Sequence, residues 1–345
     1  MRYQSDGFVL VATLWVLAAM TLFVAYFSTV VAESQAQAIT IRQQLQSNLD
    51  QQATIATLLY LSSTRPMNYA GLTTEQYSRP QNINPLTGQA PFVPNGNEIR
   101  LDGRGYHGVG QVIFRLQDAG SLISLRGENF RRLERLLEDL GVERQKRQKL
   151  IANLKDYSDR DNLVNLNGAE LREYDDKGLI RPLNRFLVSP MQLLNVIDWN
   201  NELNEKQLSA LMHEVSVYPG SRQNFNTMTK KGMQTLGLEG IDEASISKIL
   251  ENQKDKHFGN LSEVNHLTGT LIPADPMSVQ LFPSKFLRLT IVQEGQRQVQ
   301  WVGITLTPSS RFAPWQIDYS LKREVSFNTT NAANNIENSG SALFR

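Results

Sequence analysis

Residues 8–32 read FVLVATLWVLAAMTLFVAYFSTVVA, a run of twenty-five residues with no charge between Asp6 and Glu33. As an α-helix this run is about 37 Å long, enough to cross a hydrocarbon core of about 30 Å with some tilt. The alternative is a signal peptide that is removed, but its apolar run is usually about half as long and follows a more basic leader. The sequence therefore predicts one transmembrane helix, with all that follows on one side of the membrane.

The helical pattern continues beyond the membrane-spanning run. From Phe8 to Arg65 the chain has neither Gly nor Pro, the residues that most often interrupt helices. Apolar residues recur every four positions between mostly polar ones, at Ile41, Leu45, Leu49 and Ala53, with Ile55 and Leu59 continuing the stripe. This spacing predicts an amphipathic continuation that packs on a soluble domain and ends at Arg65-Pro66.

Composition excludes several classes of function. The 35 basic and 34 acidic residues give a net charge of +1 and are interspersed, so no basic face suggests a nucleic-acid partner. The chain has no cysteine, which excludes thiol catalysis, thiolate metal sites and disulfides.

The apolar period changes twice along the rest of the chain. A period of two predicts strands at Val112–Gln117, Leu287–Ile291, Val299–Gly303 and Trp315–Leu321, with a hairpin loop at 293–296. Between them, from Glu128 to about Leu271, a helical period prevails. It predicts helices over 130–140, 143–157 and 189–199 and after the N-cap candidates Asn204 and Asp242.

The N-terminus resembles that of type IV pilins and pseudopilins. A short polar leader ends in Gly7, Phe8 follows, and an uncharged run leads into a long amphipathic helix. The resemblance implies that a prepilin peptidase cuts between Gly7 and Phe8 and methylates the new amine of Phe8.

Position 12 departs from that family. Pilins usually carry Glu at the fifth mature residue, where this chain has Ala12. A carboxylate in hydrocarbon is costly unless paired, and in the family its partner is the N-terminal ammonium of a neighbouring subunit. A subunit with no neighbour ahead of it has no use for that Glu. The known exception of this kind is the K-type minor pseudopilin of type II secretion (general secretion pathway protein K).

A second stretch, Phe114 to Leu125, is similar to the strand and "DE-x-G-x-x-N-L" turn of K-type subunits, with Ala119 and Ser124 as departures. The resemblance implies an α+β fold: a pilin-like helix and antiparallel sheet interrupted by a large all-α insertion with a SAM or helix-hairpin-helix character. The expected division is a leader (1–7), a transmembrane helix (8–32), a first pseudopilin part (33–125), the inserted helical domain (126–280), a second pseudopilin part (281–325) and a disordered tail (326–345).

One acidic cluster could hold a cation. Asp156, Asp159 and Asp161 lie close together and are weak candidates for calcium, which prefers hard oxygen ligands. Their spacing does not fit an EF-hand, so an ordinary surface turn with solvated carboxylates is the competing interpretation. No other cofactor is expected.

Residues 225–250 resemble a helix-hairpin-helix unit, which makes a membrane-anchored DNA-binding or DNA-uptake component the alternative function. Against it, Asp242 and Glu243 stand where a phosphate would approach. Residues 222–270 carry six basic and six acidic residues, so the electrostatic attraction that drives non-specific DNA binding is missing.

No catalytic constellation is visible. The four histidines (His107, His213, His257 and His266) have no metal-ligand spacing, and no nucleophile elbow or phosphate-binding loop occurs. Gly103, Gly105 and Gly108 predict a loose turn. A membrane-anchored periplasmic hydrolase is therefore a poor rival, and we expect no enzyme.

The expected function is structural. The chain would be a single-pass protein of a Gram-negative inner membrane with its soluble part in the periplasm. It would prime and cap the pseudopilus tip and support export of folded proteins across the outer membrane. Its expected partners are the other minor pseudopilins, the major pseudopilin, prepilin peptidase and exported proteins, but no nucleic acid.

The first prediction is that the mature chain begins at Phe8, because there a polar leader meets an uninterrupted apolar helix. N-terminal sequencing of protein from the native membrane measures this start. Gly7→Leu should keep the leader attached, since the peptidase needs a small residue there. A mature start at Met1, or near Ala36, would contradict the pseudopilin interpretation.

Overall fold

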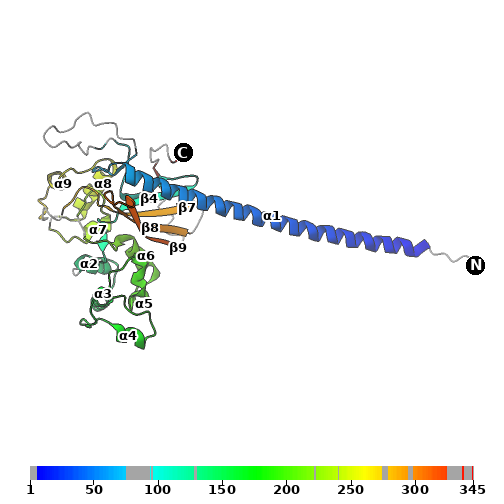
Figure 1. Ribbon diagram of the computed structural model, residues 1–345, viewed down its shortest axis with the longest axis horizontal. Helices are drawn as coiled ribbons and strands as arrows, with labels where there is room; N and C mark the ends of the chain where they lie inside the picture. Colours follow the sequence, from blue (N-terminus) through cyan, green and yellow to red (C-terminus); the bar gives the residue numbers. More distant parts are fainter. Residues whose placement is uncertain are drawn as a thin grey trace, which may run out of the picture.

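The structure is a computed structural model that describes residues 6–74, 94, 96–127, 130–220, 223–239, 241–273, 279–293, 298–324, 336–337 and 344. A long helix projects from a head in which a sheet and a group of short helices lie side by side (Figure 1). The predicted α+β class is confirmed.

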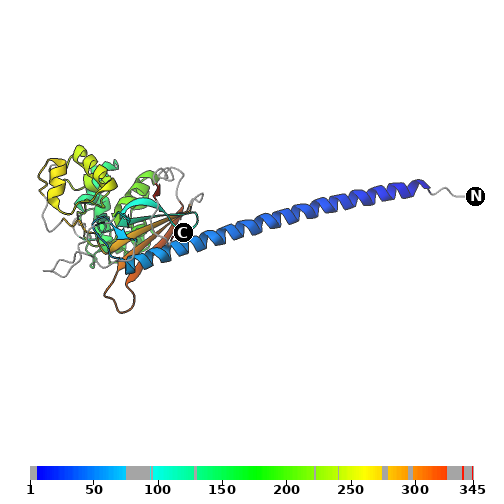
Figure 2. The same cartoon turned by 90° about the horizontal axis from the view of Figure 1, so that it is seen from above.

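Helix α1 spans Asp6–Thr64 as one unbroken element and ends just before Pro66, as predicted. From Phe8 it is long and apolar enough to cross a membrane, and the window that meets this test is not buried in the head. Further along, Leu58 and Leu61 are almost completely buried against the sheet. The helix is therefore a projecting apolar stalk in its first half and a core element in its last turns (Figure 2).

The main sheet has six strands in the order β10-β3-β4-β7-β8-β9. Its members are β3 (Asp102–His107), β4 (Val112–Asp118), β7 (Phe286–Gln293), β8 (Gln298–Leu306), β9 (Trp315–Glu324) and β10 (Ile336–Glu337). All neighbours are antiparallel except β10 and β3. The central pair joins β4 to β7, with the helical segment between them in sequence. The predicted strands are therefore present.

An apolar core lies between α1 and this sheet. Alternate side chains of the strands point into it. Phe114, Leu116, Leu289 and Ile291 face α1 from the two central strands and are almost fully buried. Two further short strands, β1 (Leu72–Thr73) and β2 (Glu98–Ile99), pair with each other and add Leu72 and Ile99 to the same core.

The segment between β4 and β7 is mainly helical. Its helices are α2 (Arg131–Asp139), α3 (Arg144–Ser158), α4 (Leu171–Asp176), α5 (Trp199–Glu202), α6 (Glu205–Glu214), α7 (Lys230–Gln234), α8 (Glu243–Asp255) and α9 (Leu261–Thr268), with the 3₁₀ helix η1 (Pro190–Asn195). Two cores hold them: one around Tyr157, Tyr174 and Trp199, the other around Phe225 and Ile249.

Several local expectations are wrong. The single helix expected over 189–199 is η1 followed by α5, because Asp198 adopts a left-handed φ of 69° between them. The expected all-α segment also contains β6 (Val215–Ser216), which pairs in parallel with β5 (Ile123–Ser124).

The loose turn expected at three glycines is also wrong, because Gly103 and Gly105 lie within β3, where the register shifts. In the tail, Ile336–Glu337 form β10 and Phe344 stacks on Phe114 at 5.1 Å. These three residues of the expected disordered tail thus belong to the head, and the disorder expected for 326–345 stays a prediction. Of the hairpin loop expected at 293–296, Gln293 is the last residue of β7 and the rest lies outside the described residues, as do leader residues 1–5 and the remaining tail residues.

One buried carboxylate joins the sheet to the helical segment. Asp118, the last residue of β4, is 1 % exposed. It accepts hydrogen bonds from the Gly120 amide (3.0 Å), the Ser284 hydroxyl (2.5 Å), Asn224 Nδ2 (3.3 Å) and the Thr227 hydroxyl (3.2 Å). Burial raises the pKa of Asp118, and these hydrogen bonds partly offset the rise. Both ends and the middle of the helical segment therefore meet at one group.

A buried arginine makes a second junction of this kind. Arg288 of β7 is 6 % exposed and donates to the carbonyl oxygens of Met212 and Val215, each at 3.1 Å, and to that of His213. Arg288 thereby supplies hydrogen-bond donors from the sheet to carbonyl oxygens at the end of α6 and the start of β6.

Candidate metal centre

Three carboxylates meet at the end of the helical lobe formed by α3 and α4. Asp156 lies in the last turn of α3, Asp159 directly follows that helix, and Glu170 precedes α4. One oxygen of each lies within 4.8 Å of the others. The cluster therefore has the donor type and compactness of a site for a hard divalent cation.

The loop between the two helices shapes the cluster. The Asn165 amide and its Nδ2 donate to Asp156, and the Gly168 amide donates to the Asn165 carbonyl. Asn167 takes a left-handed φ of 66°, which Asn tolerates better than most residues. A Cβ at Gly168 would overlap Oδ2 of Asp156, so only glycine lets the loop pass this close.

The electrostatics of the cluster are unfavourable without a cation. Glu170 is 3 % exposed, and its carboxylate meets only backbone amides at the start of α4, with neither oxygen in a hydrogen bond of good geometry. Burial, followed by the charges of Asp156 and Asp159, raises the pKa of Glu170 to about 7. Burial and the neighbouring Asp161 and Asp156 also raise the pKa of Asp159. Within the described chain, no Lys or Arg forms an ion pair with Asp156, Asp159 or Glu170. A bound cation would offset this repulsion.

The candidates named from sequence are only partly brought together. Asp156 and Asp159 belong to the cluster, but Asp161 is exposed and accepts the amide of Leu163 instead. Glu170 takes the third place. The sequence signal for Glu170 is its position just before α4. There the Glu173 side chain accepts a hydrogen bond from the Glu170 amide and fixes the backbone at the start of the helix.

The residues expected to control processing lie at the exposed start of α1. Gly7 and Phe8 are in its first turn, Phe8 is 80 % exposed, and Ala12 lies one turn further on. Cleavage at this point stays a prediction.

The helix-hairpin-helix interpretation gains no support from the geometry. The Asp242 side chain accepts the Ser245 amide at 2.8 Å and so caps the N-terminus of α8. Glu243 forms an ion pair with Lys230. The helix end that would have to face a phosphate is already occupied by a carboxylate.

A comparison with protein families agrees with the sequence resemblance. Residues 115–220 match the family model described as type II secretion system (T2SS), protein K. The match includes the end of β4 with Asp118 and the whole carboxylate cluster, and it confirms the K-type resemblance over this region. No curated protein matches the chain.

Among solved structures, the chain is similar to one in "The Crystal Structure of the GspK-GspI-GspJ complex from enterotoxigenic Escherichia coli Type 2 Secretion System". The identity is 16 %, the alignment covers 84 % of this chain and 100 % of that one, and the TM-score is 0.49.

The second prediction concerns pH and calcium. A carboxyl whose pKa is raised by folding stabilises the fold below its unfolded pKa, and this contribution is lost as the pH rises through the folded value, about 7 for Glu170. In EDTA, the melting temperature should therefore fall between pH 5 and pH 8 by more in the wild type than in Glu170→Gln.

Calcium should raise the melting temperature of the wild type more at pH 8 than at pH 5, because the ion binds the ionised carboxylates. Asp176→Asn, which changes an exposed carboxylate outside the cluster, is the control. An identical calcium response in wild type and Glu170→Gln at both pH values would contradict the site.

Proposed function

We propose that the chain is a K-type minor pseudopilin that occupies the tip of the pseudopilus of a type II secretion machine. There it primes and caps the filament and supports export of folded proteins across the outer membrane. The observation that carries the proposal is the combination of a K-type match in the head with a pilin-like α1 that lacks the usual Glu.

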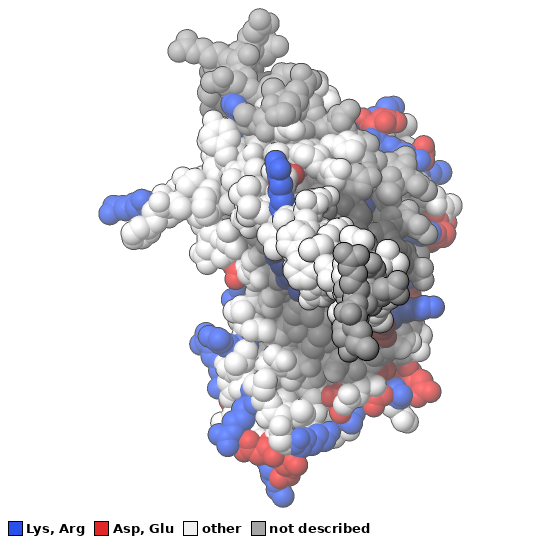
Figure 3. All heavy atoms as spheres, turned by 90° about the vertical axis from the view of Figure 1, so that its right-hand side faces the viewer, with Lys and Arg blue, Asp and Glu red and all other residues white. Residues whose placement is uncertain are grey.

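Helix α1 supplies a surface for neighbouring subunits. Beyond the membrane-spanning part, Ile39, Ile41, Leu45 and Leu49 are each more than half exposed. Seen along the helix from its N-terminal end, the part of α1 that is visible carries mostly uncharged residues (Figure 3). An apolar column of this length is stable outside a membrane only when other apolar surfaces cover it, which supports helices of other pseudopilins as its partners.

Ala12 supports a place with no subunit ahead. A Glu at this depth requires a cationic partner, which in pilins is the amine of the next subunit. An interior subunit without this Glu loses a register contact, whereas a tip subunit loses nothing. In this proposal Phe8–Ala32 span the inner membrane, and the head lies in the periplasm.

The shape of the head supports the same place. The lobe of α2–α5 extends to the side of the α1 axis, at the end far from the N-terminus (Figure 1). A subunit stacked above this one would have to pass that lobe. We therefore propose one copy per filament, seated on smaller minor pseudopilins and the major pseudopilin.

Calcium has a structural part in this proposal. A cation held by Asp156, Asp159 and Glu170 would fasten α3 to the start of α4 and stiffen the outer end of the lobe.

The third prediction places the subunit in the filament. Immunogold labelling of the head on over-produced pseudopili should mark one end of each filament, because only the end leaves room above the lobe. Labelling of a major pseudopilin on the same filaments is the control. Gold at regular intervals along the sides would contradict the tip assignment.

A further inference from the structure

The loop between β8 and β9, residues 307–314, presents a fully exposed aromatic side chain. Phe312 is 100 % exposed, more than any other large apolar residue in the described part of the chain, the membrane-spanning run included. Figure 2 shows this loop standing out from the head. Single exposed apolar residues are common on protein surfaces, so the surroundings of Phe312 decide what its exposure means.

Hydrogen bonds hold the loop in one shape. The Thr307 amide donates to the Pro314 carbonyl (2.7 Å), and the Thr307 hydroxyl donates to the Ala313 carbonyl (2.9 Å). The Ser310 amide donates to the Thr307 carbonyl (2.9 Å), and the Phe312 amide donates to the Ser310 hydroxyl (3.2 Å). Because the loop is ordered in advance, a partner that buries Phe312 loses little conformational entropy in doing so.

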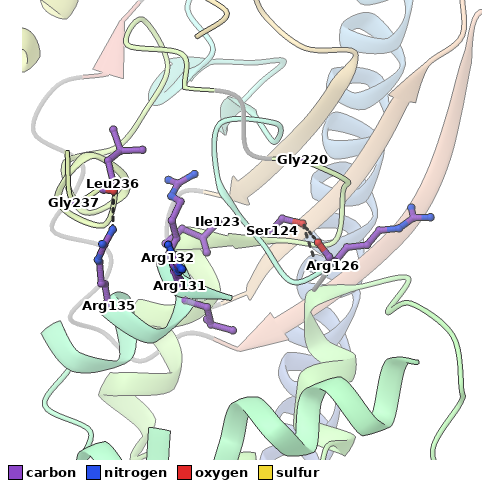
Figure 4. A pocket seen from close by; sticks show the side chains of 11 residues that line it. Ile123, Ser124, Arg126, Arg131, Arg132, Arg135, Gly220, Leu236 and Gly237 are labelled. Atoms are coloured by element: carbon purple, nitrogen blue, oxygen red, sulfur yellow. Dashed lines mark hydrogen bonds between the residues drawn. The ribbon is translucent and has the colours of Figure 1, made fainter. Parts of the chain in front are cut away.

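Arg311 stands next to Phe312 with its charge unused. It is exposed and forms no hydrogen bond or ion pair with any residue that the structure describes. The arginines of α2 differ in this respect, since Arg135 donates to the Leu236 carbonyl at 2.6 Å (Figure 4). Phe and Arg are both enriched at protein–protein interfaces. The pair fits an apolar pocket that has a carboxylate at its rim.

Strand β9, which follows the loop, has an open face. It is an edge strand, with no strand on its outer side among the described residues. Ile317 pairs with Ile304, a residue of the core between α1 and the sheet, and is nevertheless 43 % exposed. Ser320 pairs with Val302 of the same core and is exposed. Residues paired across strands share a face of the sheet, so the face of β9 beside α1 is uncovered.

The loop leaves the head on this same side. Leu306 and Trp315, which flank the loop, are partly buried on the core that contains Leu58 and Leu61 of α1. A subunit that packs along the flank of α1 therefore meets the open face of β9 and, at its end, the loop. The exposed apolar residues of α1 favour a neighbour in this position.

We propose that the β8–β9 loop and the open face of β9 dock a smaller minor pseudopilin of the same filament. This neighbour receives Phe312 in an apolar pocket and places a carboxylate opposite Arg311. The inference rests on the proposed function, because it takes the neighbour along α1 to be another pseudopilin. The anchoring membrane is too far away: residues 33–58 of α1 alone span about 39 Å, and the loop leaves the head beyond them.

The test uses the full chain in its native membrane, with the photo-cross-linking residue p-benzoylphenylalanine in place of Phe312. Irradiation should link the chain to a protein with a pilin-like N-terminus, identified by mass spectrometry. The matched control carries the same residue in place of Leu166, which is 90 % exposed in the loop between α3 and α4, and it should not link to that protein. Cross-links from position 312 to phospholipid, to a second copy of the chain or to an exported protein would overturn the proposal.

Co-purification in detergent measures the strength of the contact. Phe312→Ala should lower the recovery of the pilin-like protein about tenfold, because the association loses the burial of one Phe side chain. Its melting temperature should stay that of the wild type, since the ring is fully exposed. Arg311→Glu should lower the recovery as well, and Leu166→Ala should leave it unchanged.

The wild type separates this inference from the proposed function. If the wild type recovers a pilin-like protein and Phe312→Ala recovers as much, the docking surface is wrong and the proposed function stands. If the wild type recovers no pilin-like protein, the proposed function is contradicted, and the docking surface with it.

Discussion

The carboxylate of Asp118 is the interaction on which the rest of the head depends. The chain leaves the sheet at the end of β4 and returns to it at β7, with most of the helices inserted between these two strands. Asp118 accepts donors from the exit (Gly120), the middle (Asn224 and Thr227) and the return (Ser284). A buried carboxylate is stable only when its oxygens accept hydrogen bonds. The donors from the three segments therefore stabilise Asp118, and Asp118 in turn keeps the three segments together.

This junction gives the helical lobe a fixed place relative to α1. The sheet packs on the last turns of α1 through one apolar core, and the lobe packs through a separate core that also includes Trp301 and Tyr319 of the sheet. The carboxylate cluster stands at the outer end of the lobe, where few apolar contacts would otherwise order the loop. The proposed place at a filament tip requires a lobe held in this way relative to α1.

The sequence predicts the elements with strong local periods and misses those that tertiary contacts decide. The long helix and the main strands follow from residue spacing, since Phe114 and Leu116 alternate and no Gly or Pro interrupts α1. The break at Asp198 and the glycines within β3 depend on packing from elsewhere. Glu170 joins the metal cluster only through the fold of its loop. The arginines of α2 have the spacing of an ordinary solvated helix face, and only the fold shows that Arg132 and Arg135 donate to carbonyl oxygens at the end of α7.

The most direct test of the central claim, that one carboxylate fastens the lobe to the sheet, is the stability of Asp118→Ala. Removing the acceptor leaves several buried donors unpaired, so the free energy of unfolding should fall by about 2–4 kcal/mol. Limited proteolysis should then release fragments cut near residues 120 and 284, whereas Asp176→Ala, at an exposed carboxylate, should behave as wild type. Unchanged stability and unchanged proteolysis of Asp118→Ala would contradict the account.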